Sequence, residues 1–140
     1  MSKLPLSLFL LALPVHLACK SDEKRAEELQ QRYVEAACRL YVEPECLTNT
    51  TDTCGFSLSF ESQTDCELFF ALVGASCSIG ETLLQDEDAA DACIAYMDAW
   101  DCSTEDICDA DGNYLPEGGD CASTSAALAL ACNSGDDTGT

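Results

Sequence analysis

The sequence predicts an all-α, disulfide-rich fold, an antiparallel four-helix bundle made of two tandem helical hairpins with five cysteines each. Three observations predict it. The chain has 11 cysteines in 140 residues, a content typical of short exported chains that disulfides stabilise. One cysteine spacing occurs twice along the chain. Apolar residues recur at helical spacing, and no stretch shows the alternation of a half-buried strand.

The cysteine spacing indicates an internal duplication. Each copy spans 39 residues from its first cysteine to its last, and the copies start 55 residues apart. The first copy has cysteines at 38, 46, 54, 66 and 77, and the second at 93, 102, 108, 121 and 132. Neighbouring residues repeat at the same offset, as Leu29-Gln30 and Leu84-Gln85 do. We therefore expect one domain over residues 26–132, with repeat units of about 26–77 and 81–132.

The first unit is expected to contain two helices joined by an irregular loop. The first helix covers residues 23–42 and is stopped by Pro44. A second helix starts within residues 62–65 and continues to Cys77. Their inward-facing residues at helical spacing are Leu29, Tyr33, Ala36 and Leu40 in the first helix and Cys66, Leu68, Phe69, Leu72, Val73 and Cys77 in the second.

The second unit is expected to repeat this arrangement. Ser78 and Glu81 form a predicted capping box for a third helix over residues 81–99, and a fourth helix covers residues 120–131. The inward-facing residues are Leu83, Ala90, Ile94 and Met97 in the third helix and Leu128 and Leu130 in the fourth. Residues 133–140 are polar and predicted to be disordered.

Disulfides are favoured over a metal–thiolate site because no C-x-x-C spacing occurs. In a helical hairpin the end of one helix lies beside the start of the next, which predicts Cys38–Cys66 and, by repetition, Cys93–Cys121. Loop cysteines are expected to close locally, as Cys46–Cys54 and Cys102–Cys108. Cys77 and Cys132 stand at equivalent helix ends and are expected to join the units.

The N-terminus predicts export. Lys3 precedes an apolar run from Leu4 to Leu13, which is too short to span a bilayer. With the following Leu17-Ala18-Cys19, it resembles a bacterial lipoprotein signal. That resemblance implies a signal peptide over residues 1–18, lipidation of Cys19, a tether over 19–25 and attachment to the envelope through the lipid. Free secretion is the alternative, since His16 stands where such signals carry an aliphatic residue.

The charge of the chain restricts its partners. The chain contains six basic and 26 acidic residues, which gives a formal net charge of −20. Such a surface repels nucleic acid and anionic headgroups, which excludes nucleic acid as a partner. A protein partner is unknown from the sequence, and a basic one is compatible with the charge. The alternative is that the acidity only keeps the protein soluble.

Enzymatic activity is not expected. The chain has one histidine, His16, within the predicted signal peptide. Catalysis by Ser–His or Cys–His pairs and histidine–metal chemistry are therefore not expected of the remaining chain. Cysteines in disulfides are not nucleophiles, and the many carboxylates single out no pair. No cofactor is expected, with calcium as the one candidate.

Residues 109–113, with the sequence DADGN, resemble the start of an EF-hand calcium loop. Oxygen ligands would come from Asp109, Asp111 and Asn113 at alternate positions, and from Asp120 at the twelfth. Tyr114 stands where such loops need glycine. The alternative is an acidic turn without an ion.

Together these observations predict an exported, membrane-anchored structural or protein-interaction module of the cell envelope or surface. It resembles the small cysteine-rich lipoproteins of bacteria. A calcium-responsive binding domain is the alternative function.

Overall fold

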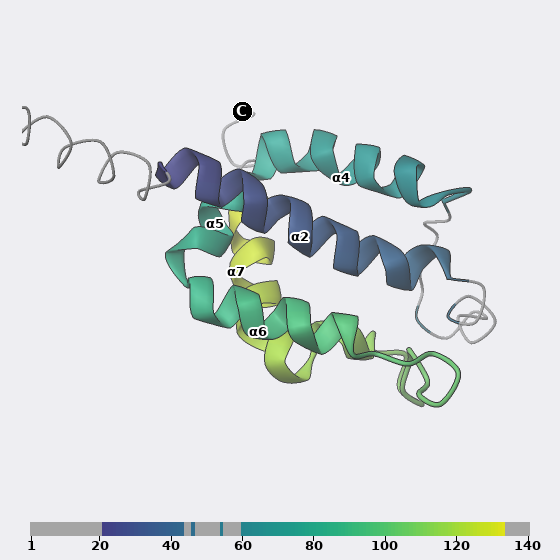
Figure 1. Cartoon of the computed structure of the whole chain (residues 1–140). Coiled ribbons are helices and arrows are strands. Elements are labelled where there is room, and N and C mark those ends of the chain that lie inside the picture. Colours follow the sequence, from purple (N-terminus) through teal and green to yellow (C-terminus); the bar gives the residue numbers. More distant parts are fainter. Residues whose placement is uncertain (1–20, 44–45, 47–53, 55–59, 134–140) are drawn as a thin grey trace, which may run out of the picture.

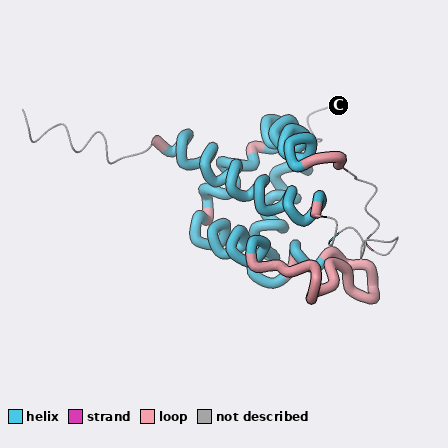
Figure 2. The backbone as a smooth tube through the Cα atoms, turned by 45° about the vertical axis from the view of Figure 1, so that its right-hand side comes forward, coloured by secondary structure: helices cyan, strands magenta, loops and turns pink. Residues whose placement is uncertain are grey.

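The computed structural model describes residues 21–43, 46, 54 and 60–133. The predicted signal peptide, Cys19 and the tail from residue 134 lie outside these residues. The described chain is helical and contains no strand (Figure 2), which confirms the all-α prediction. Its helices are α2 (Asp22–Val42), α4 (Gln63–Cys77), α5 (Ile79–Gln85), α6 (Glu87–Asp98) and α7 (Ala122–Asn133), with short 3₁₀ turns η2 (Leu115–Glu117) and η3 (Gly119–Cys121).

Helix α2 is the central element of the fold, and α4, α5 and α6 all pack against it (Figure 1). It starts at Ser21, whose side chain accepts a hydrogen bond from the Lys24 backbone N–H at 3.3 Å. This N-cap satisfies one of the backbone donors left free in the first turn. The apolar face predicted for α2 is buried at Leu29, Ala36 and Leu40. The helix therefore forms as its sequence predicts.

The third predicted helix is interrupted. Asp86, with φ −139° and ψ 78°, leaves the helical region and separates α5 from α6. Its side chain accepts a hydrogen bond from the Ala89 backbone N–H at 3.1 Å, so it is the N-cap of α6. The break allows the chain to change direction between α5 and α6.

The predicted capping box at Ser78 is wrong. Ser78 adopts a left-handed conformation, with φ 52° and ψ 48°, and its side chain makes no capping hydrogen bond. Its carbonyl oxygen instead accepts from the Thr82 backbone N–H at 3.0 Å. Because this residue ends α4 and starts α5, the two helices meet at an angle of 71°.

Helix directions follow from the contacts of α2. Arg25 pairs with Glu87, Arg32 pairs with Asp91 at 2.8 Å, and Arg39 reaches the backbone at the end of α6. The contact positions rise together along both helices, so α2 and α6 run in the same direction. Helix α4 runs back along α2, since Cys66 near its start bonds to Cys38 near the end of α2. Helices α2 and α4 thus run in opposite directions, while α2 and α6, from the first and third predicted helices, run in the same direction.

Five disulfides join the described cysteines. Cys38–Cys66 and Cys93–Cys121 each span 28 residues, and Cys77–Cys132 spans 55. These three pairs are those expected from the sequence. The two expected loop pairs, Cys46–Cys54 and Cys102–Cys108, are wrong.

The loop cysteines pair across the units instead, as Cys46–Cys102 and Cys54–Cys108, with separations of 56 and 54 residues. The physical reason is the shared direction of α2 and α6, which brings the cysteines after both helices to the same end of the molecule. Three of the five bridges, including Cys77–Cys132, therefore join equivalent cysteines of the repeat.

The core lies between α2, α5 and α6 and continues into the segment after α6. Trp100, Ile107 and Cys102 from that segment are buried with Leu40 and Leu83. A smaller cluster contains Val34, Cys38 and Cys66 between α2 and α4. Helix α4 thus packs mainly on α2, with further contacts to α5 and α7, and the disulfide Cys77–Cys132 joins it to α7.

Arg39 caps the C-terminus of α6 from α2. Its Nη2 donates to the carbonyl oxygens of Met97 and Trp100 at 2.6 and 2.9 Å, and Nη1 donates to Glu43 at 3.0 Å. The last carbonyl groups of a helix have no hydrogen-bond partner within the helix. A cation at this end is also stabilised by the partial negative charge of the helix dipole. Arg39 therefore fixes where α6 ends against α2.

We predict that Arg39→Met lowers the free energy of unfolding by about 1.5–3 kcal/mol, the usual worth of hydrogen bonds to a charged group. Arg32→Met is the matched control, because the Arg32 side chain is 53% exposed and its ion pair with Asp91 is worth less than about 1 kcal/mol. Urea unfolding of both variants measures the difference. Equal losses would contradict the capping role.

Candidate functional site

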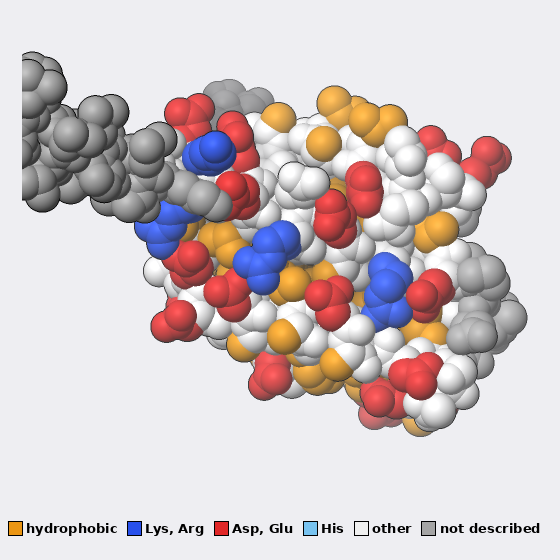
Figure 3. Space-filling view, viewed as in Figure 1, with side chains coloured by type: hydrophobic (Ala, Val, Ile, Leu, Met, Phe, Trp, Pro, Cys, Tyr) orange, Lys and Arg blue, Asp and Glu red, His pale blue; other side chains and the backbone are white. Residues whose placement is uncertain are grey.

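Helix α4 exposes apolar side chains that the sequence places inward. Leu68 is 60% exposed and Leu72 76% exposed, while Phe69 is 37% exposed. Within α4 only Cys66 and Gly74 are buried. The prediction failed because residues 68–75 of α4, with the sequence LFFALVGA, are apolar throughout, so they do not show which face meets α2. Figure 3 shows hydrophobic side chains gathered along the top of the molecule, over α4.

A groove of about 400 Å³ lies between α2 and α4, and we call it the α2–α4 groove. Its apolar surface comes from Val34 on α2 and from Leu68 and Ala71 on α4. Polar side chains border this surface from both helices. The lining residues are Glu27, Gln30, Gln31, Val34, Glu35, Thr64, Glu67, Leu68 and Ala71.

Two of the groove carboxylates accept hydrogen bonds from glutamine amides. Glu35 accepts a hydrogen bond from the Gln31 side chain at 3.0 Å, and Glu67 accepts one from the Gln63 side chain at 2.8 Å. The ion pairs found in the described part of the chain join Arg25, Arg32 and Arg39 to other carboxylates. Glu27, Glu35 and Glu67 take part in none of these ion pairs, and Glu35 and Glu67 also line an adjoining crevice with Arg32 and Arg39.

Three tyrosines form a second notable cluster below α4. Tyr41 stacks on Tyr114 with ring centroids 5.8 Å apart, and its ring lies 6.1 Å from that of Phe70 on α4. Burial, with Glu117 nearby, raises the pKa of Tyr33 to about 12 and raises the pKa of both Tyr41 and Tyr114. These phenols stay neutral at physiological pH and act as packing and hydrogen-bonding groups.

Tyr33 and Glu117 also line a crevice of about 230 Å³ between α4 and α7. Its other lining residues are Phe70, Val73, Ile79, Ser125, Leu128, Ala129 and Cys132. The Oγ of Ser125 is buried there without a hydrogen-bond partner. Much of the Glu117 side chain reaches solvent, but desolvation of its carboxyl raises its pKa. A charged Glu117 is therefore less favourable in the folded protein than in the unfolded chain.

We predict that Glu117→Gln stabilises the protein at neutral pH by less than about 1 kcal/mol, a small value because solvent still screens the carboxylate. A raised folded pKa means that stability falls as pH rises through that pKa. The variant should lack this fall, and the two proteins should be equally stable near about pH 3, where the carboxyl is protonated in both states. Thermal melts across this pH range test it.

The control for this experiment is Glu105→Gln, which removes an exposed carboxylate outside the crevice. Both variants reduce the net negative charge equally. If Glu105→Gln gives the same pH-dependent gain, the effect belongs to net charge and the role of burial at Glu117 is wrong.

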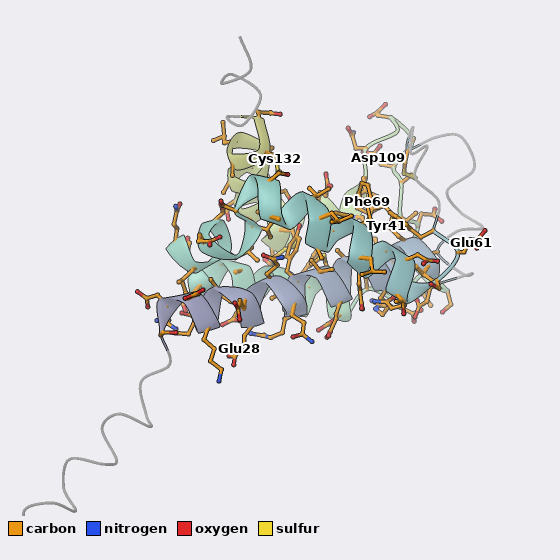
Figure 4. The ribbon with its side chains drawn as sticks, turned by 90° about the horizontal axis from the view of Figure 1, so that it is seen from above. Glu28, Tyr41, Glu61, Phe69, Asp109 and Cys132 are labelled. Atoms are coloured by element: carbon orange, nitrogen blue, oxygen red, sulfur yellow. A yellow bond between two sulfur atoms is a disulfide. The ribbon has the colours of Figure 1, made fainter. Side chains whose placement is uncertain are left out.

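The predicted calcium loop is an acidic turn closed by its own hydrogen bonds. Asp109 Oδ1 accepts from the backbone N–H groups of Asp111 and Asn113 at 2.9 and 2.8 Å, and Oδ2 accepts from the Asn113 side chain at 2.9 Å. The Asn113 side-chain bond, followed by its backbone bond, holds the pKa of Asp109 below its usual value. Figure 4 shows Asp109 in a loop that projects from the helices.

The four predicted ligands are not drawn together as a cation site. Asp120 lies in η3, and its carboxylate does not form a group with Asp109 and Asp111 within 4.8 Å. Across the described residues, the group that meets this distance is Glu43, Cys46 and Cys102, whose cysteines are bonded to each other. Calcium binding at residues 109–120 stays a prediction.

If the loop is instead an acidic turn without an ion, the melting temperature should not rise at about 5 mM calcium, above the dissociation constants usual for extracellular calcium modules. The reason is that three donors already occupy the Asp109 carboxylate. Melts with calcium and with chelator measure it. A rise that chelator reverses, and that Asp111→Asn abolishes, would establish the calcium site.

None of the described helices is by itself long and apolar enough to cross a membrane. Helices α4 and α5 together meet the criterion of length and composition, although they are bent by 71°. Comparison with family models, curated proteins and solved structures found no match.

Proposed function

We propose that the protein is an exported, disulfide-stabilised interaction module, held at the bacterial envelope or cell surface by a lipid on Cys19. Five disulfides among the described cysteines fit an oxidising, extracytoplasmic compartment, because cytosolic reductants keep thiols open. The lipid follows from the resemblance of the N-terminus to lipoprotein signals. No catalytic role is proposed.

The proposed architecture is an antiparallel bundle of two five-cysteine hairpins that are related by an approximate two-fold axis. The intra-unit bridges both span 28 residues. The remaining bridges join equivalent cysteines, which can approach each other only near such an axis. Covalent links along the axis would hold the surfaces of both units in fixed relation, which suits a rigid binding scaffold.

The observation that carries the proposal is the exposed apolar face of α4. Leu68 and Leu72 lie on one helix with 60% and 76% of their surface in solvent, and the adjoining groove continues the apolar surface to Val34. Clustered exposed apolar residues on a stable scaffold are typical of an interaction surface. Single exposed leucines, such as Leu130 on α7, need no such explanation.

The test is crosslinking in intact native cells with a photoreactive group placed at Ala75 of α4. Leu72→Asp should remove the main crosslinked product, whereas Leu130→Asp should not. Leu130 is the matched control, since it is the same residue type and is 73% exposed, close to Leu72. Equal loss in both variants, or products that neither changes, would refute α4 as the interaction surface.

Lipid anchoring is tested separately with Cys19→Ala. The parent protein should partition into the detergent phase, and the variant should lose this behaviour while its melting temperature stays the same. A parent protein found only in the aqueous phase would leave free secretion as the correct alternative.

A further inference from the structure

We propose that the α2–α4 groove binds a cationic amphipathic helix from a partner protein. The apolar side chains of that helix would contact Val34, Leu68 and Ala71, and its lysines or arginines would pair with the groove carboxylates. The inference rests on the proposed function and specifies the surface and the chemistry of the partner. Figure 3 shows acidic side chains along the region between α2 and α4.

The shape of the groove fits the side chains of a helix. Its walls are the antiparallel helices α2 and α4, and its apolar surface is continuous with exposed Leu68. Helix-binding grooves receive apolar residues spaced three or four apart from one face of the ligand. A volume of about 400 Å³ accommodates such side chains while the backbone of the ligand helix stays outside.

The spacing of the carboxylates matches two turns of a bound helix. Glu27 and Glu35 are eight residues apart on α2, which places them about 12 Å apart along the helix at 1.5 Å per residue. Basic residues at positions i and i+7 of a ligand helix lying along α2 would have nearly the same spacing. Glu67 presents a third carboxylate from the opposite wall. An apolar residue at position i+3 or i+4 of the ligand helix would then lie over the apolar part of the groove, between its two basic residues.

The negative charge of the groove favours a basic ligand over the other candidate ligands. Glu35 and Glu67 accept hydrogen bonds from glutamine amides, and Glu27 takes part in none of the ion pairs of the described chain. A second copy would bring another chain of net charge −20 against these carboxylates. The chain beyond Asn133 contains two aspartates and no basic residue, so it is repelled as well. A basic partner is attracted.

The experiment measures binding of a fluorescent synthetic helix of about 18 residues, long enough to present several turns. The probe carries leucine on one face and lysines at i and i+7 on its flank. A control peptide has glutamate in place of every lysine. Fluorescence anisotropy at low salt should show binding of the lysine peptide only, with affinity falling as salt is added.

The groove variant is Glu27→Gln/Glu35→Gln/Glu67→Gln, which keeps side-chain size and removes three charges. It should weaken binding about tenfold or more, as expected for the loss of three surface ion pairs. The control Glu81→Gln/Glu105→Gln/Asp106→Asn removes three exposed carboxylates outside the groove and should weaken binding less than about threefold. Unchanged melting temperatures confirm that both variants are folded.

Apolar contact is tested with Leu68→Ser, which should weaken binding of the same probe at high salt as well as at low salt. Equal weakening by the groove and control triples would mean that only net charge matters, and would overturn the inference. Self-association that Leu68→Ser abolishes would assign the groove to a second copy instead. If the groove variant crosslinks normally in cells while Leu72→Asp does not, the proposed function stands and this inference fails.

Discussion

Replacing Cys46 and Cys102 together with alanine is expected to lower the free energy of unfolding by about 2–5 kcal/mol. This bridge joins the two repeat units. Because Cys54–Cys108 remains, its loss opens the loop formed by residues 46–54 and 102–108 in the unfolded chain. Both cysteines are also buried in the main core, and alanine leaves space there that the neighbouring side chains fill only in part. Urea unfolding without reductant measures the loss.

The same cysteines test the connectivity. Cys46→Ala/Cys102→Ala removes a bonded pair and should add no free thiol to that of the parent. Cys46→Ala/Cys54→Ala removes one partner from each of two bridges and leaves Cys102 and Cys108 single. Thiol titration in denaturant and peptide mapping of the parent without reduction distinguish these cases. A Cys46–Cys54 peptide in that map would show that the loop cysteines close locally after all.

Gly80→Ala is expected to cost about 1–3 kcal/mol, the usual cost of inserting an atom into a filled space. A Cβ atom at Gly80 would lie 2.6 Å from the carbonyl oxygen of Ala26 and 2.9 Å from its carbon. Both are backbone atoms of α2, so the strain is relieved only by moving α5 away from α2. That movement would also lengthen the hydrogen bond from the Gly80 backbone N–H to the Gln30 side chain, now 3.2 Å.

Gly74→Ala is the matched control, because Gly74 is also a buried helical glycine facing α2. Its Cβ would lie 2.6 Å from Nε2 of Gln30, which is the end of a flexible side chain and can move. Alanine also favours the helix by up to about 1 kcal/mol over glycine. The net change should stay within about 1 kcal/mol. A larger loss for Gly74→Ala than for Gly80→Ala would contradict close α2–α5 packing.

Most helices could be predicted because their signals are local. The buried face of α2 and the helical positions of Leu83, Ile94 and Met97 follow from spacing alone, and the structure buries all of them. The break at Asp86 could not be predicted in this way. An aspartate in a helical pattern is compatible both with a solvated position and with an N-cap, and the choice depends on where α6 packs against α2.

The candidate site was largely beyond prediction. Sequence reasoning pointed to the loop with Asp109, whereas the groove combines residues of α2 and α4 from distant parts of the chain. Helix α4 has apolar residues on every side, so its sequence could not indicate that Leu68 and Leu72 would face solvent. The signal available was that uniform apolar character, which amphipathic helices do not show.

The sequence by itself determined the helical class, the duplication and the bridges Cys38–Cys66, Cys93–Cys121 and Cys77–Cys132. Tertiary structure alone decided that the loop cysteines pair between the units. Local spacing permits Cys46 to reach Cys54 or Cys102, and only the shared direction of α2 and α6 selects Cys102. That direction depends on the turns at Ser78 and Asp86, where one helix ends and the next begins, and on the contacts that α5 and α6 make with α2.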